Sequence, residues 1–285
     1  MEDPPPIQCP RGAWNELHSA AIDGSTERTL AILSRGLIDI DQGNPHGATP
    51  LVLAAVCGHS RVVRILLNKG ANVAIVDYNG SAALHCSAQT GHLVATKLLV
   101  KAGADLEAKT STTGSTPLEQ AAHQGHTGVV RALTEAEANL NSRALDGETP
   151  LYAAAQEGHV ETVKMLLRAG ANPQMTHAKP PGAAFVPLDV AAFFGHSQVA
   201  RELIQQLGIE GCGGASGGVH ALRTAALNQH LETVGILYPD KRRSGRYGNG
   251  PTRCRGFWPR VIREVPIAAA GVESWWPRSW RPGPS

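Results

Sequence analysis

A leucine recurs along this chain at almost constant spacing. It stands at positions 17, 51, 84, 118, 151, 188 and 222, so successive copies are 34, 33, 34, 33, 37 and 34 residues apart. Small residues follow each leucine, as in Ala54-Ala55, and five copies continue with a Gly-His pair such as Gly158-His159. A period of roughly 20–50 residues is typical of repeat architectures, in which each unit is buried only by its neighbours. The spacing therefore predicts seven stacked units.

The copy from Gly147 to Ala171 shows what one unit contains. Thr149 can cap a first helix that begins at Pro150, where the missing N–H of proline has no cost, and Gly158 ends that helix. A second helix follows, with apolar residues on one face at a period near 3.6, and Gly170 supplies the left-handed stop. Each unit is therefore predicted to be a pair of short antiparallel helices.

The shared pattern, G-x-T-P-L-x-x-A-A-x-x-G-H-x-x-x-V-x-x-L-L-x-x-G-A, resembles the ankyrin repeat over roughly residues 13–238. The resemblance implies an all-α repeat solenoid, an ankyrin-type helix-turn-helix stack with projecting β-hairpin fingers. Two irregularities are expected inside it, a long finger at 175–184 and a Gly-rich break at 208–218. We expect disorder in the Pro-rich lead, 1–12, and in the basic, Trp/Arg/Pro/Gly-rich tail, 239–285.

Several copies depart from the pattern in ways that predict local consequences. The first copy has Asn15-Glu16 where others have Thr-Pro, which suits a solvent-facing end cap. Ala82 removes a capping hydroxyl, whereas Thr116 and Glu119 fit a reciprocal capping box. Glu137 stands where other copies have the helix-stopping glycine, so it must become left-handed or the turn must change.

Charge is distributed unevenly along the chain. Residues 1–238 carry 16 Lys or Arg against 21 Asp or Glu, whereas residues 239–285 carry 10 against three. The five cysteines are odd in number and lack C-x-x-C spacing, and the acidic, Pro-rich start does not resemble a secretory signal. We expect an intracellular monomer, in the cytoplasm or alternatively the nucleus.

The twelve histidines do not predict a metal site or a catalytic centre. Six of them occupy the same repeat position, roughly 10 Å from one another in such a stack, too far to share a metal at about 2 Å per ligand. We expect them to be hydrogen-bonding residues in the turn between helices. The Gly-rich segment 211–218 lacks phosphate-binding spacing. The sequence therefore predicts no catalytic, cofactor-binding or metal-binding residues, no cofactor, and no enzyme activity.

Residues that vary against the constant framework are the candidates for partner binding. The resemblance implies that contacts come mainly from finger tips and from the pair before Gly-His. These candidates are Tyr78, Asn79, Gln89, Thr90, Thr112, Thr113, His123, Gln124, Leu145, Asp146, Glu148, Tyr152, Gln156, Glu157, Phe193 and Phe194. Tyr78, Tyr152 and the two phenylalanines are candidate anchors. Alternatively, the phenylalanines pack under the long finger. The neighbouring acidic residues would suit a basic partner segment.

Three functions remain open on these grounds. The leading hypothesis is a non-enzymatic protein-interaction scaffold that binds a partner's peptide or loop on its concave face. The second is an adaptor attached to nucleic acid or an anionic membrane by the basic tail, whose ten basic residues accompany four tryptophans. The third is that the chain is a fragment of a larger ankyrin-containing enzyme.

Overall fold

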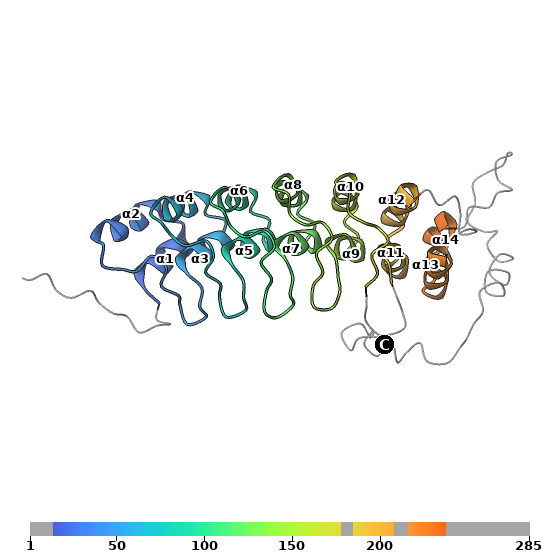
Figure 1. The fold of residues 1–285 in the computed structure, drawn as a ribbon, viewed down its shortest axis with the longest axis horizontal. Helices are drawn as coiled ribbons and strands as arrows, with labels where there is room; N and C mark the ends of the chain where they lie inside the picture. Colours follow the sequence, from blue (N-terminus) through green and yellow to red (C-terminus); the bar gives the residue numbers. More distant parts are fainter. Residues whose placement is uncertain (1–13, 178–184, 208–215, 238–285) are drawn as a thin grey trace, which may run out of the picture.

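Two parallel layers of short helices form an elongated row (Figure 1). The computed structural model describes residues 14–177, 185–207 and 216–237. The first helices of the units are α1 (Glu16–Asp23), α3 (Pro50–Val56), α5 (Ala83–Gln89), α7 (Pro117–His123), α9 (Pro150–Gln156), α11 (Pro187–Phe194) and α13 (Ser216–Leu227). The second helices are α2 (Thr26–Arg35), α4 (Ser60–Asn68), α6 (Leu93–Lys101), α8 (Thr127–Glu135), α10 (Val160–Arg168), α12 (Ser197–Leu207) and α14 (Leu231–Leu237).

The core of the stack is a double row of repeat positions. The seven leucines that define the period are all buried, none more than 7% exposed. A second row comes from the second helices and is equally buried: Ile32, Leu66, Leu99, Leu133, Leu166, Leu203 and Leu237. Each first helix packs on the next first helix, and each second helix on the next second helix. Each buried leucine contributes about 2 kcal/mol to stability, and it is covered only because a neighbouring repeat packs on it. This arrangement confirms the predicted all-α repeat solenoid.

The predicted helix caps form where the sequence has threonine or asparagine. The Thr49, Thr116 and Thr149 hydroxyls accept from the backbone N–H three residues on. In the first copy Asn15 takes this role and accepts from the N–H groups of Leu17 and His18 at 3.0 Å. The polar first copy therefore has its own complete helix start.

A histidine replaces the missing cap at Ala82. The His85 ring accepts the Ala82 N–H at Nδ1, 3.2 Å away, and donates from Nε2 to the Ala108 carbonyl at 2.8 Å. His18 makes the same two contacts, with Asn15 N at 3.1 Å and the Gln42 carbonyl at 2.9 Å. Burial lowers the pKa of both rings, which suits the neutral form that these bonds require.

Glu119 forms only half of the expected capping box. The Thr116 hydroxyl accepts from Glu119 N, but the Glu119 carboxylate accepts from the Ser115 hydroxyl at 3.0 Å instead of the Thr116 N–H. The prediction of a reciprocal box was therefore wrong in its second bond.

The Gly-His histidines connect neighbouring repeats. In His59, His92, His126, His159, His196 and His230, Nε2 lies 2.8–3.0 Å from a main-chain carbonyl near the end of the preceding first helix. The acceptors are the carbonyls of Ile22, Val56, Gln89, His123, Gln156 and Phe193. The hydrogen-bonding role predicted for these histidines is confirmed, but the bond crosses to the preceding repeat.

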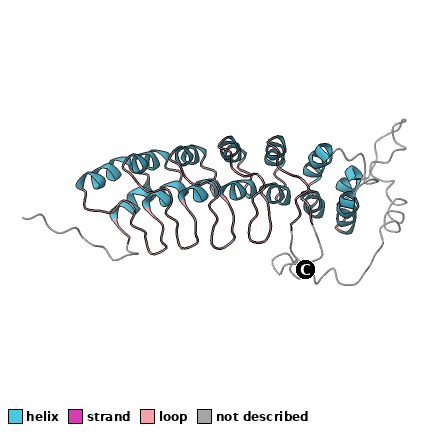
Figure 2. Ribbon diagram, in the orientation of Figure 1, coloured by secondary structure: helices cyan, strands magenta, loops and turns pink. Residues whose placement is uncertain are grey.

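The fingers are hairpin-shaped loops, which project below the first helices in Figure 1 and carry no strand in the described ranges in Figure 2. An isolated antiparallel bridge, Val76 with Ala82, marks one base and another, His177 with Phe185, marks the long finger. Adjacent fingers are joined by backbone bonds from Tyr78 N to His46 O, Ser111 N to Asn79 O, and Leu145 N to Thr113 O, at 2.8–3.0 Å. The fingers therefore form a continuous edge without a regular sheet.

The stack continues into the last helix pair. α13 packs on α11, and α14 packs on α12. α13 begins at Ser216, so residues 216–218 of the predicted 208–218 break are helical. The remaining predictions for 1–12, 178–184, 208–215 and 239–285 concern segments outside the described residues. In the described part, no helix has the length and apolar character that a bilayer crossing requires.

Candidate partner-binding surface

The predicted finger-tip residues lie at the surface. Tyr78 is 75% exposed and Leu145 is 65% exposed. Asn79, Thr112 and Thr113 are exposed as well. The Tyr78 ring and the Leu145 side chain each lie over the turn glycine of the preceding finger, Gly47 and Gly114 respectively. The tips therefore present two apolar side chains with polar ones between them.

The pair that precedes each Gly-His lies at the end of the first helix. Gln89, Thr90, Gln124 and Glu157 are exposed, while His123, Gln156 and Phe193 are half-buried. His123 Nε2 lies 3.7 Å from Glu157 Oε1, which also accepts from Gln156 Nε2 at 3.2 Å. Polar side chains of adjacent repeats thus contact one another across α7 and α9.

The two phenylalanines contact each other at the end of α11. Their ring centroids are 5.0 Å apart at 81°, and Phe194 is 39% exposed. The alternative that they pack under the long finger concerns residues 178–184, which lie outside the described part. Phe194 therefore exposes apolar surface at the end of α11, in line with the polar pairs at the ends of the other first helices.

Tyr152 does not present the surface anchor that the sequence predicts. Its side chain is only 2% exposed, and its ring stacks on that of His177, with centroids 4.9 Å apart. Burial raises the pKa of its hydroxyl, and the charges of Glu148, Asp189 and Asp146 add to this effect. Tyr152 occupies the same helical position as His18 and His85, so its burial follows from its place in the repeat.

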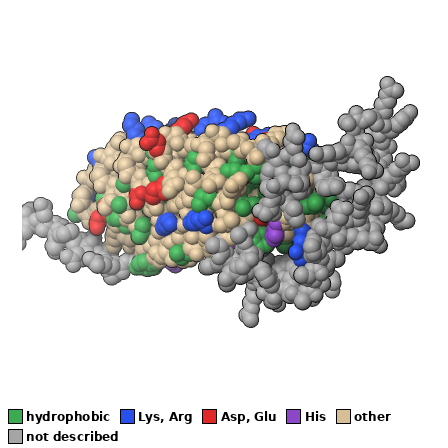
Figure 3. All heavy atoms as spheres, turned by 45° about the vertical axis from the view of Figure 1, so that its right-hand side comes forward, with side chains coloured by type: hydrophobic (Ala, Val, Ile, Leu, Met, Phe, Trp, Pro, Cys, Tyr) green, Lys and Arg blue, Asp and Glu red, His purple; other side chains and the backbone are tan. Residues whose placement is uncertain are grey.

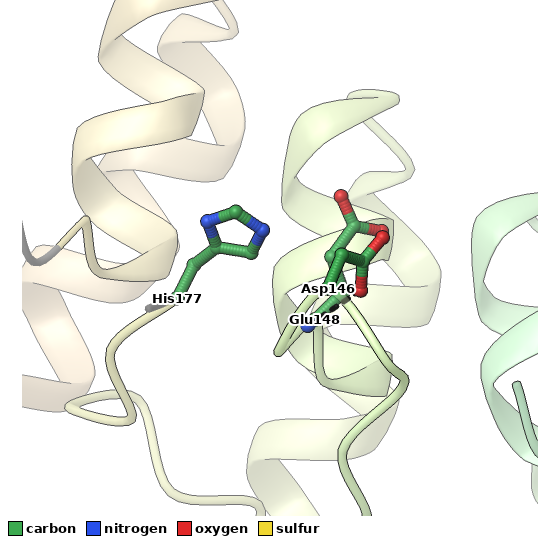
Figure 4. Close-up of side chains that lie close together, drawn as sticks. All are labelled: Asp146, Glu148 and His177. Atoms are coloured by element: carbon green, nitrogen blue, oxygen red, sulfur yellow. Dashed lines mark hydrogen bonds between the residues drawn. The ribbon is translucent and has the colours of Figure 1, made fainter. Parts of the chain in front are cut away.

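Three carboxylates lie near one another between α7 and α9. Glu119 is 5% exposed, and burial, together with the charges of Glu148 and Asp146, raises its pKa to about 8. Burial and the charges of Asp146 and Glu157 raise the pKa of Glu148 to about 7. Figure 4 shows Asp146 and Glu148 beside His177, the one group of described residues whose donor atoms could hold a metal ion. Sequence reasoning missed His177, because the extra residues of the long finger prevent an alignment of this histidine with the finger residues of the other copies.

Charge separates between the two layers of the structure. The first helices and fingers of the described residues carry twelve acidic side chains, Glu16, Asp23, Asp39, Asp41, Asp77, Asp105, Glu107, Glu119, Asp146, Glu148, Glu157 and Asp189. The same layer has three basic side chains, Lys109, Arg143 and Arg223. The second helices and the residues that end them carry the other eleven basic side chains, Arg28, Arg35, Arg61, Arg64, Lys69, Lys97, Lys101, Arg131, Lys164, Arg168 and Arg201. They also carry six acidic ones, Glu27, Glu135, Glu137, Glu161, Glu202 and Glu232, so basic side chains outnumber acidic ones in this layer. Figure 3 shows Lys and Arg along the upper edge, over this second layer.

Comparison with known families agrees with this geometry. A family model described as ankyrin repeats, in three copies, matches residues 17–110 and 107–177, more than half of the chain. The chain belongs to the ankyrin-repeat family. Ankyrin repeats generally mediate protein–protein interaction, and ankyrin-repeat domains are themselves non-catalytic.

Curated relatives of this ankyrin-repeat chain differ widely in what they are. It is 36% identical over 152 residues to the Neurogenic locus Notch protein of Drosophila melanogaster, a match to 47% of this chain and 6% of that protein. It is 35% identical over 142 residues to mouse Ankyrin repeat domain-containing protein 63, covering 47% and 36% respectively. It is 41% identical over 103 residues to Palmitoyltransferase AKR1 of Saccharomyces cerevisiae, covering 35% and 14%. The chain thus spans little more than a third of these relatives at most.

Proposed function

We propose that this chain is a non-catalytic interaction scaffold that binds a basic peptide or loop of a protein partner along its first helices and fingers. The observation that carries the proposal is the charge separation between the layers. Ten acidic side chains on the first layer are exposed or half-buried, since Glu119 and Asp189 are buried, and they face only three basic ones. This excess favours a positively charged partner, because complementary charge steers encounter and suppresses wrong partners.

The composition of the surface supports an extended contact. Tyr78, Leu145 and Phe194 supply exposed apolar area, and aromatic anchors carry much of the energy of protein interfaces. Gln89, Gln124 and Glu157 lie exposed at the ends of consecutive first helices, so their functional groups repeat along the stack. A segment that runs along the stack would meet polar groups at each repeat and an apolar side chain near either end.

Carbodiimide cross-linking tests this assignment directly, because it joins carboxylates to lysine amines in contact with them. The full chain is used to capture partners from a cell extract, the complexes are cross-linked, and the joined peptides are identified by mass spectrometry. We expect partner lysines joined to Asp146, Glu148 or Glu157. Products confined to second-helix carboxylates such as Glu135 and Glu161 would contradict the proposed surface.

Matched variants separate the two layers. Removing the acidic charges with Asp146→Asn and Glu157→Gln is expected to lower capture of the cross-linked partner at least about tenfold. Removing basic charges from the other layer with Arg61→Ala and Lys97→Ala is expected to leave it unchanged. Equal loss in both variants, with unchanged helical circular dichroism, would argue against the first layer. Internal products that join these carboxylates to Lys241 would assign the surface to the chain's own basic tail.

A further inference from the structure

The finger before α9 and the finger before α11 bring together side chains that commonly bind metals. One ligand atom each from Asp146, Glu148 and His177 lies within 4.8 Å of the others (Figure 4). Two carboxylates and an imidazole are ligand types that zinc and related divalent transition metals accept. Because His177 is 29 residues or more from the two acids in sequence, only the stacking of fingers creates this group.

Two of these side chains, Asp146 and His177, belong to residues that make contacts of their own. The Asp146 carboxylate accepts from Glu148 N at 3.0 Å, which fixes the turn between them. His177 N donates to Phe185 O at 2.7 Å, and the imidazole ring stacks on Tyr152 at an interplanar angle of 16°. Asp146 and His177 are therefore already oriented by contacts that do not depend on a ligand.

A fourth carboxylate gives independent support. Glu119 is 5% exposed, and its Oε2 is buried without a hydrogen-bond partner, while Oε1 accepts from Ser115. An unpaired carboxylate oxygen is expensive to bury. No lysine or arginine in the described residues forms an ion pair with Glu119, Asp146 or Glu148. Within the described part, Lys109 acts on Glu119 only through its charge, without forming an ion pair.

The direction of the Glu119 side chain follows from its position in the repeat. At the same helical position His18 and His85 reach the finger that follows, through the carbonyls of Gln42 and Ala108. The finger that follows Glu119 is the one that carries Asp146 and Glu148. The charges of Asp146 and Glu148 act on the Glu119 carboxyl group, which places that group near the acidic pair.

We propose that Asp146, Glu148 and His177 bind a divalent transition-metal cation, with zinc as the best match, and that this cation joins the two fingers. A cation here would also neutralise two of the carboxylates that face a basic partner, so metal and partner would compete. The metal site itself does not depend on the proposed partner.

Calorimetric titration of the full chain with zinc chloride, after treatment with EDTA and dialysis, tests the proposal. We expect the wild-type chain to bind one equivalent more than His177→Phe, a variant that keeps an aromatic ring to stack on Tyr152 but has no ligand atom. Asp146→Asn is expected to weaken the same equivalent at least about tenfold. Tenfold excess magnesium chloride is expected not to compete, because magnesium disfavours imidazole.

His46→Ala is the matched control, since His46 is an exposed histidine on an earlier finger. It is expected to bind as many zinc equivalents as the wild type, with the same affinity. Melting in EDTA checks that all variants fold, and zinc is expected to raise the melting temperature of the wild type but not that of His177→Phe. Identical zinc stoichiometry and affinity in the wild type and in folded His177→Phe and Asp146→Asn would overturn the proposal, as would the absence of zinc binding to the wild type.

Discussion

Gly91 lies directly against the ring of His126 in the next repeat. A Cβ atom on Gly91 would be only 2.6 Å from His126 Nδ1, while the ring's Nε2 lies 3.0 Å from the Gln89 carbonyl. The same contact recurs in the pairs Gly24–His59, Gly58–His92, Gly125–His159, Gly158–His196 and Gly195–His230. The last copy has Gln229 at this position, with a φ of 61°, and no further repeat follows among the described residues to place a histidine ring against it. The glycine is therefore needed for the neighbour's ring as well as for its own φ.

Two glycine substitutions are expected to differ in cost for this reason. Gly91→Ala meets both a left-handed φ of 79° and the His126 ring, whereas Gly70→Ala meets only a φ of 88° with open space around the new Cβ. We expect Gly70→Ala to lower the free energy of unfolding by about 1 kcal/mol, and Gly91→Ala by about 1–3 kcal/mol more. Urea denaturation of both variants measures the difference. Equal losses would show that the ring moves aside freely.

Glu137→Gly is expected to stabilise the chain. Glu137 has a φ of 68° at the position where Gly36, Gly70, Gly103 and Gly170 are left-handed. Of the two outcomes that the sequence allowed, the side chain takes the left-handed conformation and the turn is unchanged. We expect a gain of up to about 1 kcal/mol, roughly 2–4 °C in melting temperature.

Glu137→Ala is the control for this change, because alanine removes the charge and keeps the strained φ. It is expected to leave the melting temperature nearly unchanged. A comparable rise with alanine would show that the carboxylate, and not the backbone, limits stability here.

Glu119 is expected to make stability fall as pH rises. Its pKa is raised from the ordinary value to about 8, so between about pH 4.5 and 8 the folded chain keeps a proton that the unfolded chain has lost. Glu119→Gln removes this term and can still accept from the Ser115 hydroxyl. We expect the variant to be more stable at pH 8.5 by a few kcal/mol at most, since one pKa unit corresponds to about 1.4 kcal/mol, and to gain little at pH 4.5.

Chemical denaturation at several pH values from about 4.5 to 8.5, with EDTA present, measures how the free energy of unfolding changes with pH. If the free energy of unfolding changed with pH equally in the wild type and in Glu119→Gln, the Glu119 carboxylate would ionise freely despite its burial.

His220 is expected to titrate above its ordinary pKa. Its Nδ1 lies 3.3 Å from Oδ1 of Asp189, a carboxylate that is 1% exposed, and this contact raises the histidine pKa. Stability from the pair is present below about pH 6.5 and is lost as pH rises through the raised pKa. Asp189→Asn, which can still accept from Val186 N, is expected to lower the titration midpoint of His220. NMR of the imidazole protons measures this midpoint. An unchanged midpoint in Asp189→Asn would show that the contact with Asp189 does not raise the pKa of His220.

Most of the architecture could be predicted from the chain because it depends on positions that repeat. The buried leucines, the capping threonines and the strained Glu137 were all identifiable, since each depends on a short local pattern. The positions of side chains in the candidate site were harder to predict. Tyr152 has the composition of an interface anchor, but its helical position directs it under the following finger.

The sequence alone determined that the units are helix pairs, how many there are, and where most of them begin and end, because these follow from hydrophobic period, caps and glycine stops. The exception is α13, which begins at Ser216 inside the predicted Gly-rich break. Leu17-His18 corresponds to Leu84-His85 in the repeat, but the role of both rings as cap substitutes became visible only in the structure. Only the tertiary structure decided which side chains of different repeats meet. The contacts of His126 with Gly91, and of His177 with Asp146, cross between units, and their geometry depends on how one helix pair packs on the next.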